Sequence, residues 1–214
     1  LINLLSINGV INIGNNASLS SLNGLDNINY ATITNLSILS SNTLSTCNVQ
    51  GICDYLSIPS NPSSISGNAS GCASQYEVVN TCLGCPVGNI TLTTQAQIDS
   101  YSANYPGCNI ISGNLTIDDS GSGNITNLNG LLQLSFIAGN LTIQNTTALT
   151  SFFGLNNISS ILGSTYIYNN TAVTSLTGLN GLTSVGGDIE LFNNGAMTSL
   201  TGLNNLVTIG GTLV

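Results

Sequence analysis

The sequence predicts a mainly β protein, namely a right-handed parallel β-solenoid with coils of about 24 residues and disulfide-tied caps in the middle of the chain. Three observations support this prediction. Glycines recur at a fixed interval in the C-terminal half, apolar residues alternate after each of these glycines, and six cysteines gather between two stretches that carry the repeat. Fixed periods of about 20 to 50 residues are typical of stacked repeat folds.

The clearest repeat is a glycine that recurs every 24 residues, at Gly139, Gly163, Gly187 and Gly211. Each glycine opens a short segment such as Gly139-Asn-Leu-Thr-Ile, in which Leu141 and Ile143 alternate with polar residues. This period of two is typical of a half-buried strand. Because one coil cannot bury its own apolar face, we expect the coils to stack on a shared core with their strands in a parallel sheet.

Two further residue types follow the same period. The glycines of a Gly-Leu-Asn sequence are expected in turns that disfavour a Cβ atom: Gly154, Gly178 and Gly202. The asparagines of that sequence are expected to form a buried ladder that satisfies backbone groups inside each coil: Asn156, Asn180 and Asn204.

The repeat also fixes the order of the pieces. Gly9-Val-Ile-Asn-Ile-Gly-Asn15-Asn16 matches the segment from Gly163 to Asn170, but the period stops after Leu39. We therefore expect the last coils of one solenoid in residues 1–46 and its disulfide-tied C-terminal cap in residues 47–84. The N-terminal cap of a next solenoid would occupy residues 85–112, and its coils residues 113–214.

The charge balance excludes several partners. The chain has no Lys, Arg or His and eight acidic residues, which gives a net charge of −8. Nucleic acids and anionic membrane surfaces need cationic side chains, so neither is an expected partner. The sequence shows no signal peptide and no apolar run long enough for membrane insertion. The even number of cysteines predicts disulfides and hence an extracellular or cell-surface location.

Several motifs carry a family resemblance. They are the Gly-x-Leu-x-Ile strands, the Leu-Thr-Ser-Leu-x-Gly-Leu turns, the stretch from Leu44 to Cys53 and the stretch from Leu92 to Tyr101. With them, nearly the whole chain resembles the receptor L-domain superfamily, leucine-rich-repeat-like β-solenoids that include repetitive secreted microbial surface proteins. The resemblance implies three disulfides: Cys47 with Cys53, Cys72 with Cys82, and Cys85 with Cys108. Residues alone permit many connectivities, and Cys82-x-x-Cys85 leaves a redox or zinc site open, although no His or cationic neighbour supports it.

N-linked glycans are the candidate modification, and no cofactor is expected. The Asn-x-Ser/Thr sequons lie at Asn16, Asn35, Asn68, Asn89, Asn114, Asn124, Asn140, Asn145, Asn157 and Asn169. In Asn114-Leu-Thr and Asn140-Leu-Thr the sequon residues alternate with apolar ones, which predicts that they face outward.

Candidates for catalysis are few, and we expect neither an enzyme nor a metal site. Without His, Lys or Arg the chain lacks the usual bases and anion clamps. The carboxylate pairs Asp188 with Glu190 and Asp118 with Asp119 would suit a glycosidase or a calcium ion, but neither pair has the surrounding groups of those sites. A solvated polar face is the preferred interpretation.

Two functions remain. The first is a glycosylated structural building block whose copies adjoin end to end in a tandem array or filament. Gly211-Thr-Leu-Val214 placed before Leu1-Ile-Asn3 matches the segment from Gly187 to Asn193, although the junction lacks half a coil. The second is an adhesive or ligand-binding module that presents its sheet face to a glycan or a peptide. That face would carry Ser164, Tyr166, Asp188 and Glu190, with Tyr168 at the coil corner.

Overall fold

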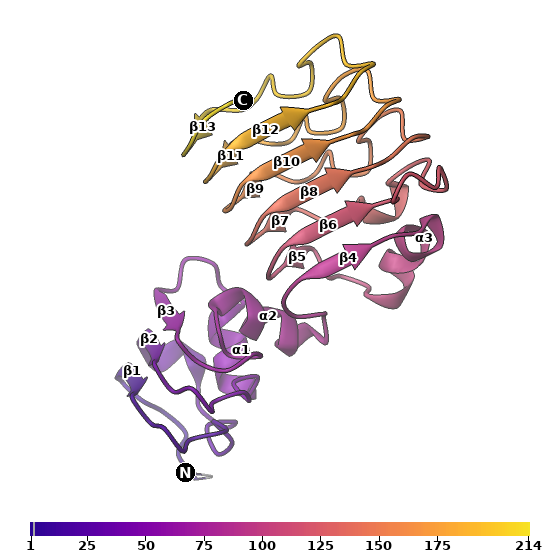
Figure 1. Cartoon of the computed structure of the whole chain (residues 1–214). Coiled ribbons are helices and arrows are strands. Elements are labelled where there is room, and N and C mark those ends of the chain that lie inside the picture. Colours follow the sequence, from indigo (N-terminus) through magenta and orange to yellow (C-terminus); the bar gives the residue numbers. More distant parts are fainter. Residues whose placement is uncertain (2) are drawn as a thin grey trace. The chain divides into compact units, whose positions relative to one another are not determined.

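The computed structural model describes Leu1 and residues 3–214 of the chain. It divides into two compact units, Leu1–Val87 and Gly88–Val214. Within the described residues the strands form three sheets, in which every strand pairing is parallel (Figure 1). The prediction of a mainly β protein built from parallel sheets is confirmed.

The C-terminal unit contains two parallel sheets that run along the same stack of coils. The main sheet has the strand order β12-β10-β8-β6-β4. Its strands are β4 (Ile90–Leu92), β6 (Leu115–Asp118), β8 (Leu141–Gln144), β10 (Thr165–Tyr168) and β12 (Ile189–Phe192). The second sheet consists of two-residue strands: β5 (Ile110–Ile111), β7 (Phe136–Ile137), β9 (Ser160–Ile161), β11 (Ser184–Val185) and β13 (Thr208–Ile209).

The strand register in the main sheet aligns equivalent positions of successive repeats. Thr165 lies opposite Leu141 on one side and Ile189 on the other, so each neighbour is 24 positions away in the sequence. Leu141 and Ile143 are fully buried, while Thr142 between them is partly exposed. Stacking therefore produces one continuous apolar core, as the alternating pattern predicts.

The N-terminal unit has its own core and one sheet of three strands, β1 (Gly9–Gly14), β2 (Ile33–Leu39) and β3 (Ser63–Ser66). The last strand, β3, lies inside the segment expected to be a cap, so the sheet continues into the cysteine-bearing region. The remaining elements of this unit are the 3-10 helix η1 (Tyr30–Thr32) and the helices α1 (Gln50–Leu56) and α2 (Gln75–Leu83).

Three helices interrupt the β pattern and were not expected. Two of them begin with recognisable capping residues. The Ser74 side chain accepts a hydrogen bond from the backbone of Glu77 at the start of α2, and Thr94 forms a capping box with Gln97 at the start of α3 (Gln95–Asn104). A Ser or Thr followed three residues later by Glu or Gln is a sequence signal for a helix start. The 3-10 helix η2 (Asn129–Leu131) completes the C-terminal unit.

The repeated turn glycines occupy the conformation that the sequence predicts. Gly154, Gly178 and Gly202 have φ angles of 116°, 110° and 120°. A Cβ atom on Gly178 would lie 2.0 Å from the backbone carbon of Phe152 in the previous coil. These positions therefore require glycine both for the backbone angle and for close stacking.

The buried asparagines are not the ones that the repeat suggested. Asn180 and Asn204 are exposed, and Asn156 is half-buried. The buried asparagine of the described C-terminal unit is Asn170. Its Oδ1 accepts hydrogen bonds from the backbone N and Oγ1 of Thr146, and its Nδ2 donates to the Ile143 carbonyl. Asn194 repeats the donation one coil later, to the Ile167 carbonyl. The prediction named the wrong asparagine because only the residue that follows the left-handed turn points into the coil.

Candidate functional site

The outward-facing side of the main sheet, called the outer face here, is the candidate site. Alternation along each strand assigns its residues: Thr116 and Thr142 stand next to one another on β6 and β8, followed by Tyr166 on β10 and Glu190 on β12. Toward the carboxyl ends of the same strands the outer face continues with Asp118, Gln144, Tyr168 and Phe192. The polar residues of β6 and β8 thus give way to aromatic ones on β10 and β12.

Three aromatic rings meet on the last two strands of the sheet. The ring centroids of Tyr166 and Tyr168 are 5.7 Å apart, and those of Tyr168 and Phe192 are 5.8 Å apart. Phe192 is 46% exposed. With Glu190 between them, these residues form what we call the aromatic–acidic patch: Tyr166, Tyr168, Glu190 and Phe192.

A hydrogen bond fixes the acidic member of the patch. The hydroxyl of Tyr168 donates to Oε2 of Glu190 across the two strands. Desolvation raises the pKa of Tyr168 above its ordinary value of 10.0, and the hydrogen bond to Glu190 and its charge raise it further. Tyr168 therefore remains a neutral donor, and it lies on the outer face beside Tyr166 instead of at the coil corner.

The opposite edge of the outer face is held by a row of side-chain acceptors. Oδ1 of Asn114 accepts from the backbone N of Asn140, whose Oδ1 accepts from the backbone N of Ser164. Oγ of Ser164 accepts from the backbone N of Asp188. Oδ1 of Asp188 accepts from the backbone N and Oγ1 of Thr212, and these bonds lower the pKa of Asp188. The row keeps the strands in register up to the patch.

A shallow hollow lies beside the patch, at the turns that follow β6, β8 and β10. It is lined by Ser120, Gly121, Asn145, Thr147 and Asn169. Asn145 and Asn169 have left-handed backbone angles, with φ of 57° and 55°. Nδ2 of Asn169 donates to Oδ1 of Asn145, and Nδ2 of Asn145 donates to Oδ1 of Asp118. Left-handed turns suit asparagine better than other residues with a side chain, so this hollow has a rigid polar wall.

The comparisons with known proteins bear on this geometry. Residues 107–177 match the family model described as Receptor L domain. The matched segment contains β6, β8 and β10 and therefore Tyr166 and Tyr168 of the patch. The resemblance inferred from the repeat motifs is thus confirmed over this stretch. No curated protein and no solved structure matches the chain.

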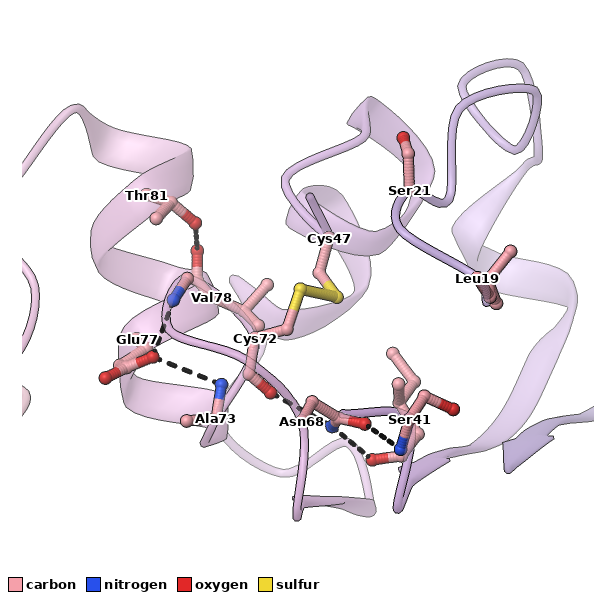
Figure 2. The surroundings of a disulfide bond; sticks show 12 residues. Leu19, Ser21, Ser41, Cys47, Asn68, Cys72, Ala73, Glu77, Val78 and Thr81 are labelled. Atoms are coloured by element: carbon pink, nitrogen blue, oxygen red, sulfur yellow. Dashed lines mark hydrogen bonds between the residues drawn. A yellow bond between two sulfur atoms is a disulfide. The ribbon is translucent and has the colours of Figure 1, made fainter. Parts of the chain in front are cut away.

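The disulfides differ from the pairs that the resemblance implied. The structure joins Cys47 to Cys72 (Figure 2) and Cys53 to Cys82. The expected pairs of Cys47 with Cys53 and Cys72 with Cys82 are therefore wrong. Cys53 lies in α1 and Cys82 in α2, and their bridge fastens the two helices together. The bridges span 25 and 29 residues, which links successive layers instead of closing short loops.

The remaining two cysteines, Cys85 and Cys108, are also disulfide-bonded. Six disulfide-bonded cysteines exclude a free Cys-x-x-Cys redox or zinc site at Cys82 and Cys85. Together with the receptor L-domain match, they indicate an extracellular or secreted protein. None of the helices in the described part of the chain has the length and apolarity to cross a bilayer.

The sequon asparagines differ in how strongly the fold uses them. Each of the ten is at least partly exposed. Asn68, however, donates both Nδ2 hydrogens, to the carbonyls of Ile38 and Cys72, and its Oδ1 accepts from the backbone N of Ser41 (Figure 2). A glycan on Nδ2 would replace one of these donors. Asn114 and Asn140 use only Oδ1 in the edge row, which leaves Nδ2 accessible for a glycan.

The acidic residues at the end of β6 and in the loop after it have a structural role. Asp119 is only 2% exposed, and its Oδ1 accepts hydrogen bonds from Ser122 Oγ and from the backbone N atoms of Asn124 and Ile125. The carboxylate of Asp118 accepts hydrogen bonds from Nε2 of Gln144, Nδ2 of Asn145 and the backbone N of Ser120. Among residues 1 and 3–214, no group of three or more His, Cys, Asp or Glu side chains could hold a metal ion. Asp188 and Glu190 do stand on one face, as the alternation predicts, with Ile189 buried between them.

Proposed function

We propose that this chain is a recognition module of a cell-surface protein, with an adhesive or ligand-binding role, that holds its ligand on the outer face of the main sheet. The observation that carries the proposal is the aromatic–acidic patch. Aromatic residues form only 5% of the chain, yet three of them meet on two adjacent strands, where Phe192 is exposed and the two tyrosines are half-buried. Clustered aromatic anchors are a common feature of binding sites.

The distribution of sequons supports the same proposal. Asn89, Asn114 and Asn140 occupy the edge row in the first three strands of the main sheet, but Ser164 and Asp188 replace them in the last two. The edge row beside β10 and β12 contains no sequon, although the sequon at Asn169 directly follows Tyr168 at the end of β10. Glycans on Asn89, Asn114 and Asn140 would hydrate this nearly uncharged protein and leave the edge row beside the patch uncovered.

In this proposal the coils are right-handed and about 24 residues long. The module binds without catalysing a reaction, because the chain lacks His, Lys and Arg. The match to the receptor L-domain model favours recognition and gives no support to a structural filament. Copies joined end to end therefore stay a prediction.

The test is a binding screen on arrays of immobilised peptides and oligosaccharides with variants that copy a neighbouring strand. Tyr166→Thr and Tyr168→Gln together give β10 the outer residues of β8, which the fold already accommodates. Phe153→Ala is the matched control, because Phe153 is 52% exposed in a turn outside the sheet. We expect the double variant to lose the wild-type signals and the control to keep them. Equal signals for the wild-type protein and the folded double variant would reject the outer face as a binding site.

A further inference from the structure

The aromatic–acidic patch carries negative charge that nothing in the protein neutralises. The chain contains no Lys, Arg or His, so its carboxylates have no cationic side chain as a partner. Three carboxylates belong to the outer face of the main sheet: Asp118, Asp188 and Glu190. A ligand that brings positive charge gains from all three, whereas an anionic ligand meets only repulsion.

The two carboxylates next to the rings keep free oxygen atoms. Glu190 uses Oε2 to accept from Tyr168, and Asp188 uses Oδ1 to accept from Thr212. The other oxygen of each group makes no hydrogen bond in the described part of the chain. Glu190 lies on β12 and Asp188 directly precedes that strand, so the two residues are two positions apart in extended chain, a spacing of about 7 Å. This is also the distance between alternate side chains of an extended peptide.

The aromatic rings complete a cation site. Cations bind over aromatic faces within about 6 Å of the ring centroid, and arginine does so most often. Tyr166 and Phe192 flank the strand positions beside Glu190, and the Tyr168 hydroxyl holds the carboxylate between the rings. A guanidinium group bound there would lie on a ring and donate to the free Oε1 at the same time.

We propose that the ligand of the aromatic–acidic patch is an extended peptide segment with arginine or lysine at alternate positions, one contacting Glu190 and the rings and the next contacting Asp188. This inference rests on the proposed function and names the chemical class of its ligand. A neutral oligosaccharide would also stack on the rings, but it would gain nothing from the uncompensated carboxylates.

The test measures binding of a fluorescent peptide with arginines at alternate positions, and of the same peptide with citrulline in their place. Citrulline keeps the shape and most hydrogen-bond donors but has no charge. We expect the arginine peptide to bind more tightly, and its affinity to fall as salt shortens the Debye length from about 10 Å at 0.1 M to about 3 Å at 1 M. Glu190→Gln should weaken arginine binding about two- to fivefold, as expected for one exposed ion pair.

The control variant is Asp99→Asn, which removes the same charge from an exposed position on α3. It should leave the affinity for the arginine peptide unchanged, whereas Phe192→Leu should weaken it about two- to fivefold through the lost cation–π contact. Equal affinities for the arginine and citrulline peptides, or equal effects of Glu190→Gln and Asp99→Asn, would overturn the cationic ligand. Binding of a neutral oligosaccharide that depends on Tyr166 and Tyr168, without binding of the arginine peptide, would overturn it while leaving the proposed function intact.

Discussion

Replacing Asn170 by alanine should destabilise the C-terminal unit far more than any exposed asparagine substitution. Asn170 and Thr146 are both fully buried. Asn170→Ala leaves the backbone N–H and the hydroxyl of Thr146 without the acceptor that they share, at 3.3 and 2.7 Å, and removes the donor to the Ile143 carbonyl. A buried polar group that loses its partner costs about 1–3 kcal/mol. With the two Thr146 donors counted, we expect the free energy of unfolding to fall by about 2–4 kcal/mol.

The assay is urea unfolding followed by circular dichroism, with Asn180→Ala as the matched control. Asn180 belongs to the same repeat but is exposed, and its side chain accepts one local hydrogen bond from the backbone N of Gly178. Its loss should cost less than about 1 kcal/mol. Thr146→Val combined with Asn170→Ala should cost less than the sum of the single changes, because valine has no hydroxyl to leave unpaired. Equal shifts for Asn170→Ala and Asn180→Ala would refute the reasoning.

Three other outcomes follow from the geometry. Gly178→Ala should lower stability by about 3 kcal/mol or more in a thermal melt, because its Cβ would meet the backbone of Phe152 at 2.0 Å, whereas Gly195→Ala, with no atom within 4 Å, should be nearly neutral. Peptic digestion without reduction should give peptides cross-linked by disulfides between Cys47 and Cys72 and between Cys53 and Cys82. A disulfide between Cys47 and Cys53 in the digest would contradict the structure. Desolvation opposes ionisation of Asp118, but hydrogen bonds from Asn145, Gln144 and Ser120 outweigh it and lower the pKa of this carboxyl below 3.8. Its stabilising effect is therefore complete above that pH and disappears as the pH falls through the lowered pKa, so Asp118→Asn should flatten the acid limb of a stability-against-pH curve.

The repeat made the parallel sheets predictable, because periodic apolar residues determine both strand position and register. Leu141 and Ile143, and Ile189 and Leu191 two repeats later, needed no information beyond the alternation, whereas the polar Thr165 in the equivalent buried position did. The turn glycines were equally predictable, since the spacing of Gly154, Gly178 and Gly202 points to a conformation repeated in each coil. The buried asparagine was not predictable. Asn170 follows the left-handed residue Asn169, and the spacing of the repeat does not reveal how that backbone conformation directs the next side chain.

The disulfide pairing and the full set of patch contacts could not be predicted from the sequence, for different reasons. Cys53 and Cys82 meet because α1 and α2 pack together, and those helices were missed although Ser74 and Glu77 signal the start of the second one. For the patch, the alternation correctly placed Tyr166 and Glu190 on one face. The contact of Tyr168 with Phe192 depends on the length of β10 and β12, which extend to these residues instead of turning before them.

Because equivalent positions in successive coils form the same contacts, a whole coil can be deleted or inserted without changing the contacts between the coils on either side. Removing residues 163–186 would join Leu162 to Gly187. The backbone N of Asp188 would then donate to Oδ1 of Asn140, which in the intact protein accepts a hydrogen bond from the backbone N of Ser164. Ile189 would then lie against Leu141, and left-handed Asn193 against Asn145. Such a deletion would shorten the sheet and take away both tyrosines without opening a gap in the stack. Gene duplication or loss in steps of one coil can therefore change what the surface displays while the scaffold stays the same.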